Sequence, residues 1–341
     1  MTRPTATMID ADSAPDTVYA AIEAGGTKFV CALAHADGTL VERARFSTRG
    51  PQDTLAEARA FFDAAATRHG KPRALGIASF GPLELDPAAP HYGRLLRTPK
   101  PGWHDADLLA PFATLDIPIA LDTDVNAAAL AEAHWGAGRD RDGAPLDNVV
   151  YVTVGTGIGG GAVLHGRTLR GLLHPELGHI HPRRHPHDHG FAGICPHHGD
   201  CLEGLANGPA IVARLGHELG DASPTHPIWD IEADYLGQLC AQLALTLSPQ
   251  RIILGGGVMQ HDRLFAPIRA RTQHWLGGYL ARREVEDGID HSIVPPGLGD
   301  RSGILGALRL AMAADTDANA RTANGMAPDV PHPDMREAMK K

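Results

Sequence analysis

This chain of 341 residues lacks the features that mark several classes of protein. It contains no run of ~18 apolar residues, so we expect no transmembrane helix. Residues 1–16 have neither the basic start nor the apolar block of a signal peptide, and we expect them to form a flexible tail. Positive charge is also scarce. The 31 Lys and Arg against 40 Asp and Glu leave a net charge of −9, which argues against nucleic-acid binding.

Cysteine is scarce as well, and its four copies are of two kinds. Cys31 and Cys240 stand alone among apolar residues, a pattern typical of buried free thiols. Cys195 and Cys201 lie at the end of a short stretch that holds eight of the 20 histidines. We expect a reduced, cytoplasmic protein, in which a close cysteine pair indicates a metal site more often than a disulfide.

Glycine and proline, in contrast, are plentiful, at 39 and 26 residues, which favours tight turns over a helical bundle. The hydrophobic content of 43% is ordinary and excludes a wholly disordered chain. The pattern predicts strands over residues 18–23, 29–34 and 40–46 and a helix over 51–68. Further strands are expected over 74–79, 117–121, 148–154, 161–164 and 251–254, and further helices over 125–133, 209–219, 228–247, 263–276 and 302–313.

A unit of strand, glycine-rich turn and strand occurs twice, with turns that begin at Gly25 and Gly155. The repeat indicates a duplicated α/β architecture with one unit per domain. We expect an N-terminal α/β domain over residues 17–127, completed by a C-terminal helix near 302–314, and a second domain over 128–301. Residues 315–341 are polar and are expected to form a flexible tail.

Glycine turns between strands let backbone N–H groups surround phosphate oxygens, and a nearby hydroxyl adds a donor. The chain re-enters a strand after each turn, which excludes a Walker A loop. A plain hairpin is the alternative for either turn alone. A third glycine triplet follows the strand at 251–254, and the three turns together indicate a nucleotide clamp in an actin- or hexokinase-like cleft. The candidate nucleotide-binding residues of the turns are Gly25, Gly26, Thr27, Gly155, Thr156, Gly157, Gly255, Gly256 and Gly257.

Six segments resemble, in order, the motifs of the ROK family of sugar kinases. They are Glu23-Ala-Gly-Gly-Thr-Lys28, Asp122-Thr-Asp-Val-Asn126, Val154-Gly-Thr-Gly-Ile-Gly159, Glu176-Leu-Gly-His179, Cys201-Leu-Glu203 and Gly255-Gly-Gly257. Three further stretches resemble the bacterial fructokinases of that family: Thr98-Pro-Lys-Pro-Gly-Trp103, Cys195-Pro-His-His-Gly-Asp-Cys201 and Val294-Pro-Pro-Gly-Leu-Gly-Asp300.

The resemblance implies a two-domain actin/hexokinase-like (ribonuclease H-like, duplicated) fold with a cleft between the domains. It implies an ATP-dependent fructokinase that phosphorylates O6 of D-fructose with Mg²⁺, carries a structural Zn²⁺ and forms a homodimer. One alternative is a glucose or mannose kinase on the same scaffold. Another is a non-catalytic ROK-type sugar sensor, but the repressor form of that alternative needs a helix-turn-helix, and only about seventeen residues precede the first expected strand.

Asp124 is the candidate catalytic base, because phosphoryl transfer needs a carboxylate that orients and deprotonates the attacking hydroxyl. The alternative is a helix N-cap, with Asp122 as a competing cap. The resemblance favours catalysis and implies that Asn126 contacts the sugar. The family usually has Asn before this Asp, whereas this chain has Thr123, so the pocket differs there.

Cys195, His198 and Cys201 have the tight spacing of metal ligands, and His179 lies sixteen residues upstream of Cys195. Four N and S ligands make a closed tetrahedral zinc site, which is structural because no position is left for water. We therefore expect a zinc loop over residues 179–201. His197 in place of His198 and a merely solvated loop are the alternatives.

Binding both His179 and Cys201 to one metal would bring Glu176 and Glu203 together, and the resemblance implies that these carboxylates and His179 bind sugar hydroxyls. A surface turn and helix-start electrostatics are the respective alternatives for the two glutamates. Gly81 and Trp103 are expected to line the sugar side, although a buried core Trp is a simpler interpretation. The resemblance also implies that Glu23 helps to bind magnesium through water and that Lys28 is a candidate nucleotide-binding residue, with a solvated side chain as the alternative for Lys28. Asp300 is expected to cap a helix. The remaining histidines are expected in a mobile, exposed loop that could form a subunit contact: His181, His185, His187 and His189.

Overall fold

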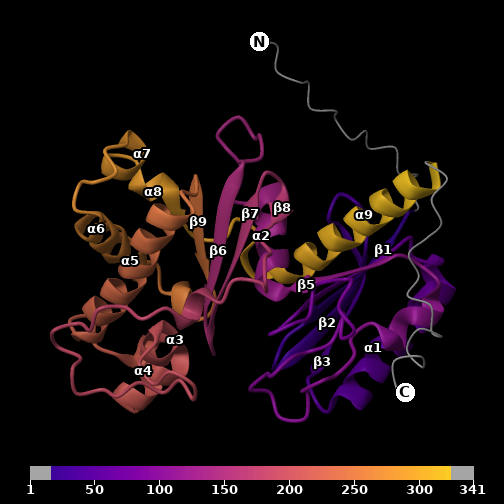
Figure 1. Ribbon diagram of the computed structural model, residues 1–341, viewed down its shortest axis with the longest axis horizontal. Coiled ribbons are helices and arrows are strands. Elements are labelled where there is room, and N and C mark those ends of the chain that lie inside the picture. Colours follow the sequence, from indigo (N-terminus) through magenta and orange to yellow (C-terminus); the bar gives the residue numbers. More distant parts are fainter. Residues whose placement is uncertain (1–16, 324–341) are drawn as a thin grey trace.

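The computed structural model describes residues 17–323, and within them the chain forms two lobes, each built on a five-stranded sheet (Figure 1). The strands of the N-terminal sheet lie in the order β3-β2-β1-β4-β5. Their bounds are β1 Tyr19–Ala24, β2 Lys28–Ala34, β3 Leu40–Ser47, β4 Leu75–Ser79 and β5 Ile119–Thr123. The first three strands are antiparallel neighbours, while β4 and β5 continue the sheet in parallel with β1.

Both faces of the N-terminal sheet are covered, which explains why β1 and β2 are almost continuously apolar. Ile22 faces Leu55 and Phe62 of helix α1 (Pro51–His69). Ala21, one residue away, faces the opposite side, where helices α2 (Asp124–Trp135) and α9 (Ser302–Ala323) pack. The alternation of a strand therefore divides one apolar run between two cores.

The C-terminal sheet repeats the topology of the first, in the order β10-β9-β6-β7-β8. Its strands are β6 Asn148–Val154, β7 Ile158–Leu164, β8 Arg167–Thr168, β9 Arg251–Gly255 and β10 Ile293–Val294. β6 pairs antiparallel with β7 and parallel with β9, as β1 pairs with β2 and β4. Helices α5 (Ile228–Thr246) and α6 (Phe265–Leu276) cover one face, and α2 covers the other.

Helices α2 and α9 cross between the lobes, where Figure 1 shows them side by side. Small residues permit the close approach: a Cβ on Gly306 of α9 would come 2.2 Å from the Ala127 carbonyl oxygen of α2. The helix expected to end near residue 314 continues to Ala323, so residues 315–323 are helical rather than tail. Tyr19 and Arg73 both bind Asp315, which fixes this extra length on the N-terminal lobe. The expected tails at 1–16 and 324–341 lie outside the described residues.

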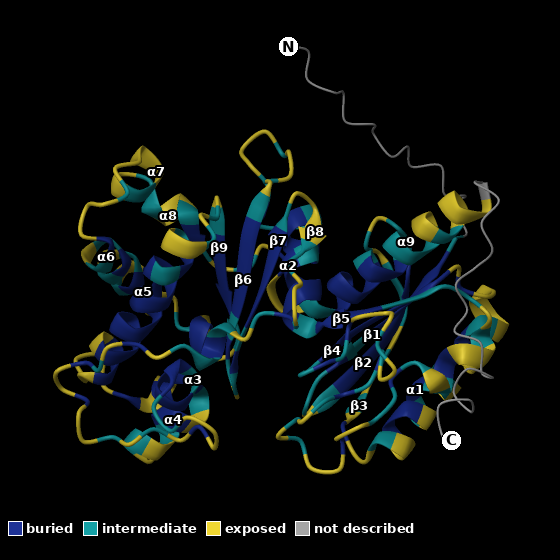
Figure 2. Ribbon diagram, viewed as in Figure 1, coloured by how far each residue is buried: buried dark blue, intermediate teal, exposed yellow. Residues whose placement is uncertain are grey.

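Burial is concentrated in the two sheets and in the helices that pack on them, α5 among them (Figure 2). Short elements complete the C-terminal lobe. They are α3 Leu202–Ala206, α4 Gly208–Leu215, α7 Arg283–Glu286 and α8 Ile289–Ser292. The helix expected over 209–219 stops at Leu215 because Gly216, with φ of 79°, ends it in the left-handed region. Among residues 17–323, no helix is both long enough and apolar enough to span a membrane.

Candidate active site

Asp124 lies where β5 ends and α2 begins, at the level where the two lobes meet. The N-cap of α2 is neither Asp122 nor Asp124 but Thr123, whose hydroxyl accepts a hydrogen bond from the Asn126 amide at 3.1 Å. Threonine is a good N-cap, and its capping role leaves the Asp124 carboxylate free for another use. That carboxylate accepts a hydrogen bond from the Val125 amide at 2.9 Å.

The environment of Asp124 raises its pKa to about 7. Burial is the main cause, and the negative charges of Glu23 and Glu176 add to it. Burial also raises the pKa of Glu23, with a further contribution from Asp300, while Lys28 opposes the shift. Acidic groups of both lobes, Glu23 and Glu176, therefore act on Asp124. A carboxyl group that titrates near pH 7 is suited to accept a proton during catalysis.

Glu176 and Glu203, the expected sugar ligands, lie within electrostatic reach of each other. Burial raises the pKa of Glu176 to about 7, and the Glu203 carboxylate contributes to the shift. Oε2 of Glu203 accepts a hydrogen bond from the Ile158 amide at 2.9 Å. A Cβ on Gly157 would lie 2.7 Å from the same oxygen. Gly157 is therefore required for the placement of Glu203, a reason that the phosphate motif alone does not give.

The glycine turns approach the site from both lobes. In the first, the Gly25 amide donates to the Lys28 carbonyl at 2.9 Å, and a Cβ on Gly25 would lie 2.8 Å from that oxygen. In the second, the Gly155 amide donates to the Gly157 carbonyl at 2.9 Å. The triplet 255–257 adjoins the second turn, because a Cβ on Gly155 would lie 3.7 Å from the Gly257 nitrogen. Two of the three turns thus line one side of the site.

The expected metal ligands form one cluster. The ligand atoms of His179, Cys195, His198 and Cys201 all lie within 4.8 Å of one another. Sγ of Cys195 is 3.8 Å from Nδ1 of His179 and 3.7 Å from Nδ1 of His198. In a tetrahedral zinc site with bonds of about 2.0–2.3 Å, ligand atoms are separated by about 3.3–3.8 Å. The four residues therefore fit a tetrahedral metal ion, and His198 rather than His197 belongs to the group.

Two predicted substrate contacts do not reach the surface of the site. Trp103 is fully buried among Phe29 and Phe80, and its indole N–H donates to the Arg49 carbonyl at 2.8 Å. The expectation that Trp103 lines the sugar side is wrong, and the simpler interpretation of a core residue is confirmed, because the apolar ring completes the N-terminal core. Asn126 is also fully buried, and its side-chain N–H donates to Asp122.

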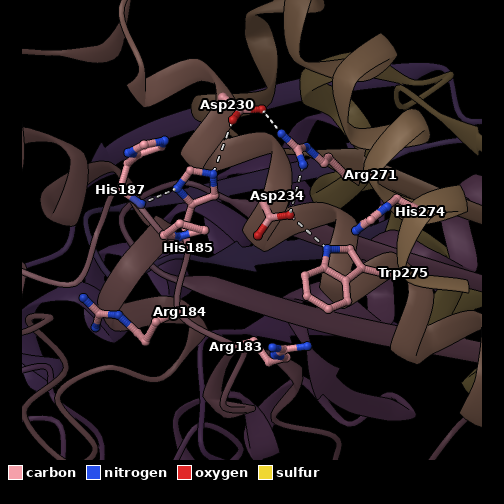
Figure 3. Close-up of a pocket in the computed structure, with 10 residues that line it drawn as sticks. Arg183, Arg184, His185, His187, Asp230, Asp234, Arg271, His274 and Trp275 are labelled. Carbon is pink, nitrogen blue, oxygen red and sulfur yellow. Dashed lines mark hydrogen bonds and ion pairs between the residues drawn. The ribbon is translucent and has the colours of Figure 1, made fainter. Parts of the chain in front are cut away.

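The histidine-rich loop is not uniformly exposed. His185 is 4% exposed, its Nε2 lies 3.3 Å from Asp230, and its Nδ1 accepts a hydrogen bond from the His187 amide. Figure 3 shows these contacts at a hollow of about 440 Å³, beside Arg271 and Trp275 of α6. The expectation of an exposed position is wrong for His185, since α5 covers it, whereas His181, His187 and His189 are exposed. None of the expected catalytic residues lines this hollow.

Sequence reasoning missed a buried network beneath the site. Asp122 accepts hydrogen bonds from Asn126, from Thr168 at 2.9 Å and from Arg170 at 2.6 Å. These contacts join the end of β5 to the segment that follows β7, and so join the two lobes. The sequence signal was weak, because an Asp at the end of a strand resembles an ordinary cap, and its partners Thr168 and Arg170 lie more than 40 residues away.

Comparison with known proteins shows which family the chain matches and which relatives it resembles. Residues 19–314 match the ROK family. The fructokinase of Zymomonas mobilis is 43% identical over 302 residues, which cover 87% of this chain and 97% of that protein. The fructokinase of Pediococcus pentosaceus is 42% identical over 295 residues, covering 86% and 97%.

A solved structure shares the architecture described above. It is a ROK family glucokinase from Streptomyces griseus in complex with glucose and AMPPNP. The match has a TM-score of 0.65 and 26% identity, and covers 87% of this chain and 99% of that one. The two-lobed α/β architecture is the actin/hexokinase-like fold.

Proposed function

This chain belongs to the ROK family, and we propose that it is an ATP-dependent fructokinase that converts D-fructose to fructose 6-phosphate. Relatives named fructokinase, at 42–43% identity over nearly their whole length, support the reaction and the sugar. The observation that carries the mechanism is the Asp124 carboxyl, with a pKa of about 7, at the meeting point of the lobes.

In the proposed reaction, Asp124 accepts the proton of the fructose 6-hydroxyl as its oxygen attacks the γ-phosphorus of ATP. The bond between that oxygen and phosphorus forms, the bond from phosphorus to the β,γ-bridging oxygen breaks, and ADP leaves. The carboxylate orients the hydroxyl for in-line attack and removes its proton late, as the new bond forms. Movement of the two lobes toward each other would exclude water from this step.

The sugar is held by Glu176, Glu203 and His179. Each carboxylate accepts hydrogen bonds from hydroxyl groups, so a sugar that lacks one of them leaves a half-buried acceptor unpaired. The Ile158 amide fixes Glu203 from behind. Asn126, which the sequence assigned to the sugar, acts in this scheme through Asp122 and the start of α2.

The nucleotide phosphates lie along the glycine turns at Gly25 and Gly155, with Thr27 as an exposed hydroxyl donor. Mg²⁺, when bound, neutralises charge on the transferring phosphoryl group. The residues present suit it, because burial and neighbouring negative charge raise the pKa of both Glu23 and Asp124, and a cation relieves that repulsion. Glu23 would hold the ion through water.

Zinc is the metal that best suits the cluster of two histidines and two cysteines. A closed site of four protein ligands leaves no position for substrate, so its role is structural. When bound, it would fix Glu203, which follows Cys201 by two residues at the start of α3, and Glu176, which precedes His179 by three. None of the four cysteines, all of which the structure describes, is in a disulfide, and this suits the cytoplasm. The homodimer implied by the family resemblance stays a prediction, which light scattering would test.

The test is ADP release from MgATP by the zinc-loaded protein with fructose, glucose, mannose, N-acetylmannosamine or no sugar. We expect strong turnover with fructose, and a loss of at least about a hundredfold in Asp124→Asn. Turnover only with another hexose would retain the mechanism and refute the fructose assignment. Sugar binding without turnover on any sugar would favour the sensor alternative.

A further inference from the structure

His174 lies between the two lobes and has no role in the mechanism above. It belongs to the segment that leads from β8 to Glu176, and it is 7% exposed. Its Nε2 accepts a hydrogen bond from the Leu83 amide of the N-terminal lobe at 3.1 Å. On the other side of the ring, Nδ1 lies 3.4 Å from Oε1 of Glu176. One imidazole therefore joins the N-terminal lobe to a proposed sugar ligand.

The two contacts fix the tautomer of the ring. Nε2 accepts from an amide, so it carries no proton, and a neutral imidazole then has its proton on Nδ1. Burial lowers the pKa of His174, which keeps the ring neutral. The proton-bearing Nδ1 is thus the ring atom that lies 3.4 Å from Oε1 of Glu176, with the backbone of Pro175 as a second acceptor beside the ring.

Exposure separates the roles of the two side chains. Of the His174 side chain 3% is exposed, against 42% of the Glu176 side chain. The carboxylate is open to a ligand, while the imidazole supports it from behind. Gly81, which the sequence assigned to the sugar side, lies against this ring, because a Cβ there would be 3.2 Å from Cε1 of His174. The absence of a side chain at Gly81 makes room for the imidazole.

We propose that His174 is a positioning residue for sugar binding, which holds the Glu176 carboxylate at the angle that receives a hexose hydroxyl. The proposal rests on the proposed function of Glu176. The other charged groups near the ring are Asp122 and Arg170, and these pair with each other at 2.6 Å. Glu176 is therefore the carboxylate that lies beside Nδ1.

Two substitutions separate the two contacts. His174→Asn keeps an N–H donor near the position of Nδ1 and loses the acceptor for Leu83. His174→Gln keeps an acceptor near the position of Nε2 and loses the ring nitrogen that lies beside Glu176. A purely structural role predicts that sugar KM and thermal stability change together in both variants, whereas a positioning role predicts that they separate.

The experiment measures KM for fructose, KM for MgATP, kcat and Tm for these variants and for His174→Ala. We expect Gln and Ala to raise the fructose KM by roughly tenfold, the loss expected for one hydrogen bond to a charged group, with KM for MgATP unchanged. Asn should keep the fructose KM within about threefold of the unmodified protein but lower Tm. His165→Asn, whose imidazole is 85% exposed, is the matched control.

Gly81→Ala provides a second route to the same contact. Its added methyl group displaces the ring without removing it, so we expect a raised fructose KM even if the His174 variants fold poorly. The proposal is overturned if Gln, Ala and Gly81→Ala leave the fructose KM within about twofold, or if KM for both substrates rises together. The unmodified protein is assayed first across the hexoses, and the sugar that it phosphorylates is then used for all variants. An error in the sugar assignment is thereby distinguished from an error in the role of His174.

Discussion

At the scale of single residues, the surroundings of each carboxyl group decide its role. Asp122 and Asp124 are two positions apart, yet Asp122 accepts hydrogen bonds from four groups, those of Thr123, Asn126, Thr168 and Arg170. Asp124 is held by one neighbouring amide and faces the acidic groups of both lobes. Asp122 therefore has a structural role, because it binds the groups around it. Asp124 keeps carboxylate oxygens that can accept a hydrogen bond from a substrate.

The pH dependence of activity follows from this difference. Asp124 and Glu176, each with a pKa of about 7, act as carboxylates, so kcat/KM for fructose should rise as the pH increases from 5.5 to 8. Because both groups must lose a proton, the rise in log(kcat/KM) should be steeper than one per pH unit below the midpoint. A flat profile over this range would contradict the assignment. Glu176→Gln should reduce the slope of the remaining activity to one.

Asp124→Asn should stabilise the protein while it removes activity. The folded-state pKa of about 7 exceeds the value near 3.9 of an unfolded Asp, so ionisation destabilises the folded state progressively as the pH rises between those values. The asparagine carries no charge, and its gain in Tm should be larger at pH 8 than at pH 5.5. Urea or thermal unfolding at both pH values measures this. An equal effect at the two values would show that Asp124 ionises normally in the folded protein.

At the scale of elements, the loop that carries the proposed metal ligands positions the short helix α3, which follows it. The loop is closed on itself by reciprocal hydrogen bonds between Cys195 and Gly199 and is joined to α3 by the bond from Ile194 N–H to the Gly204 carbonyl. α3 has five residues, too few to be stable alone, and it begins beside Cys201. A metal ion held by the four clustered residues would thus orient Glu203, which the short helix by itself could not do.

Neighbouring histidines offer a matched test of this arrangement. His198→Ala should lose bound zinc, lower Tm by roughly 5 °C or more, and raise the KM for fructose, because α3 and Glu203 lose their anchor. His197→Ala should retain zinc, Tm and KM, since His197 is outside the cluster. Metal content by mass spectrometry and thermal unfolding provide the readouts. Equal zinc loss in the two variants would refute the ligand assignment.

At the scale of the whole molecule, the contact between α2 and α9 fixes the two lobes relative to each other. Glu132 of α2 is fully buried and accepts hydrogen bonds from three places: the segment just after α2, the segment before α9 and the start of α9. Its donors are the amides of Ala137, Gly297 and Leu298 and the Ser302 hydroxyl. Next to Ser302, Gly303 lies against the Glu23 carboxyl, so this contact also reaches the proposed magnesium position.

Removal of this carboxylate should destabilise the whole protein. Glu132→Ala leaves buried donors unpaired, and we expect a loss of about 3 kcal/mol or more in the free energy of unfolding. Tm should fall by roughly 6–12 °C for such a loss. Glu57→Ala, at an exposed ion pair with Arg49, is the control and should change little. Equal unfolding midpoints for the two variants would mean that the crossing tolerates rearrangement.

Local pattern accounts for much of what could be predicted. Alternation and apolar runs predicted the longer strands of both sheets within a few residues, because a strand buried on both faces is apolar throughout. The two-residue strands β8 and β10 were not predicted, because so short a segment carries no pattern. The close grouping of these His and Cys residues could also be predicted, since three of the four lie within seven residues and metal-binding chemistry restricts their type. The end of α9 was missed because polar, Asp-containing residues resemble a tail until a partner such as Arg73 is known.

The sequence by itself determined the family, the duplicated topology and the residue types of the site, because these depend on local spacing and side-chain chemistry. The tertiary structure decided which residues face the site. It placed Trp103 in a core, gave the cap of α2 to Thr123, and put His174 against Glu176. Each of these outcomes depends on contacts between segments far apart in the chain, such as Leu83 with His174, and burial and charge at such contacts are set by packing.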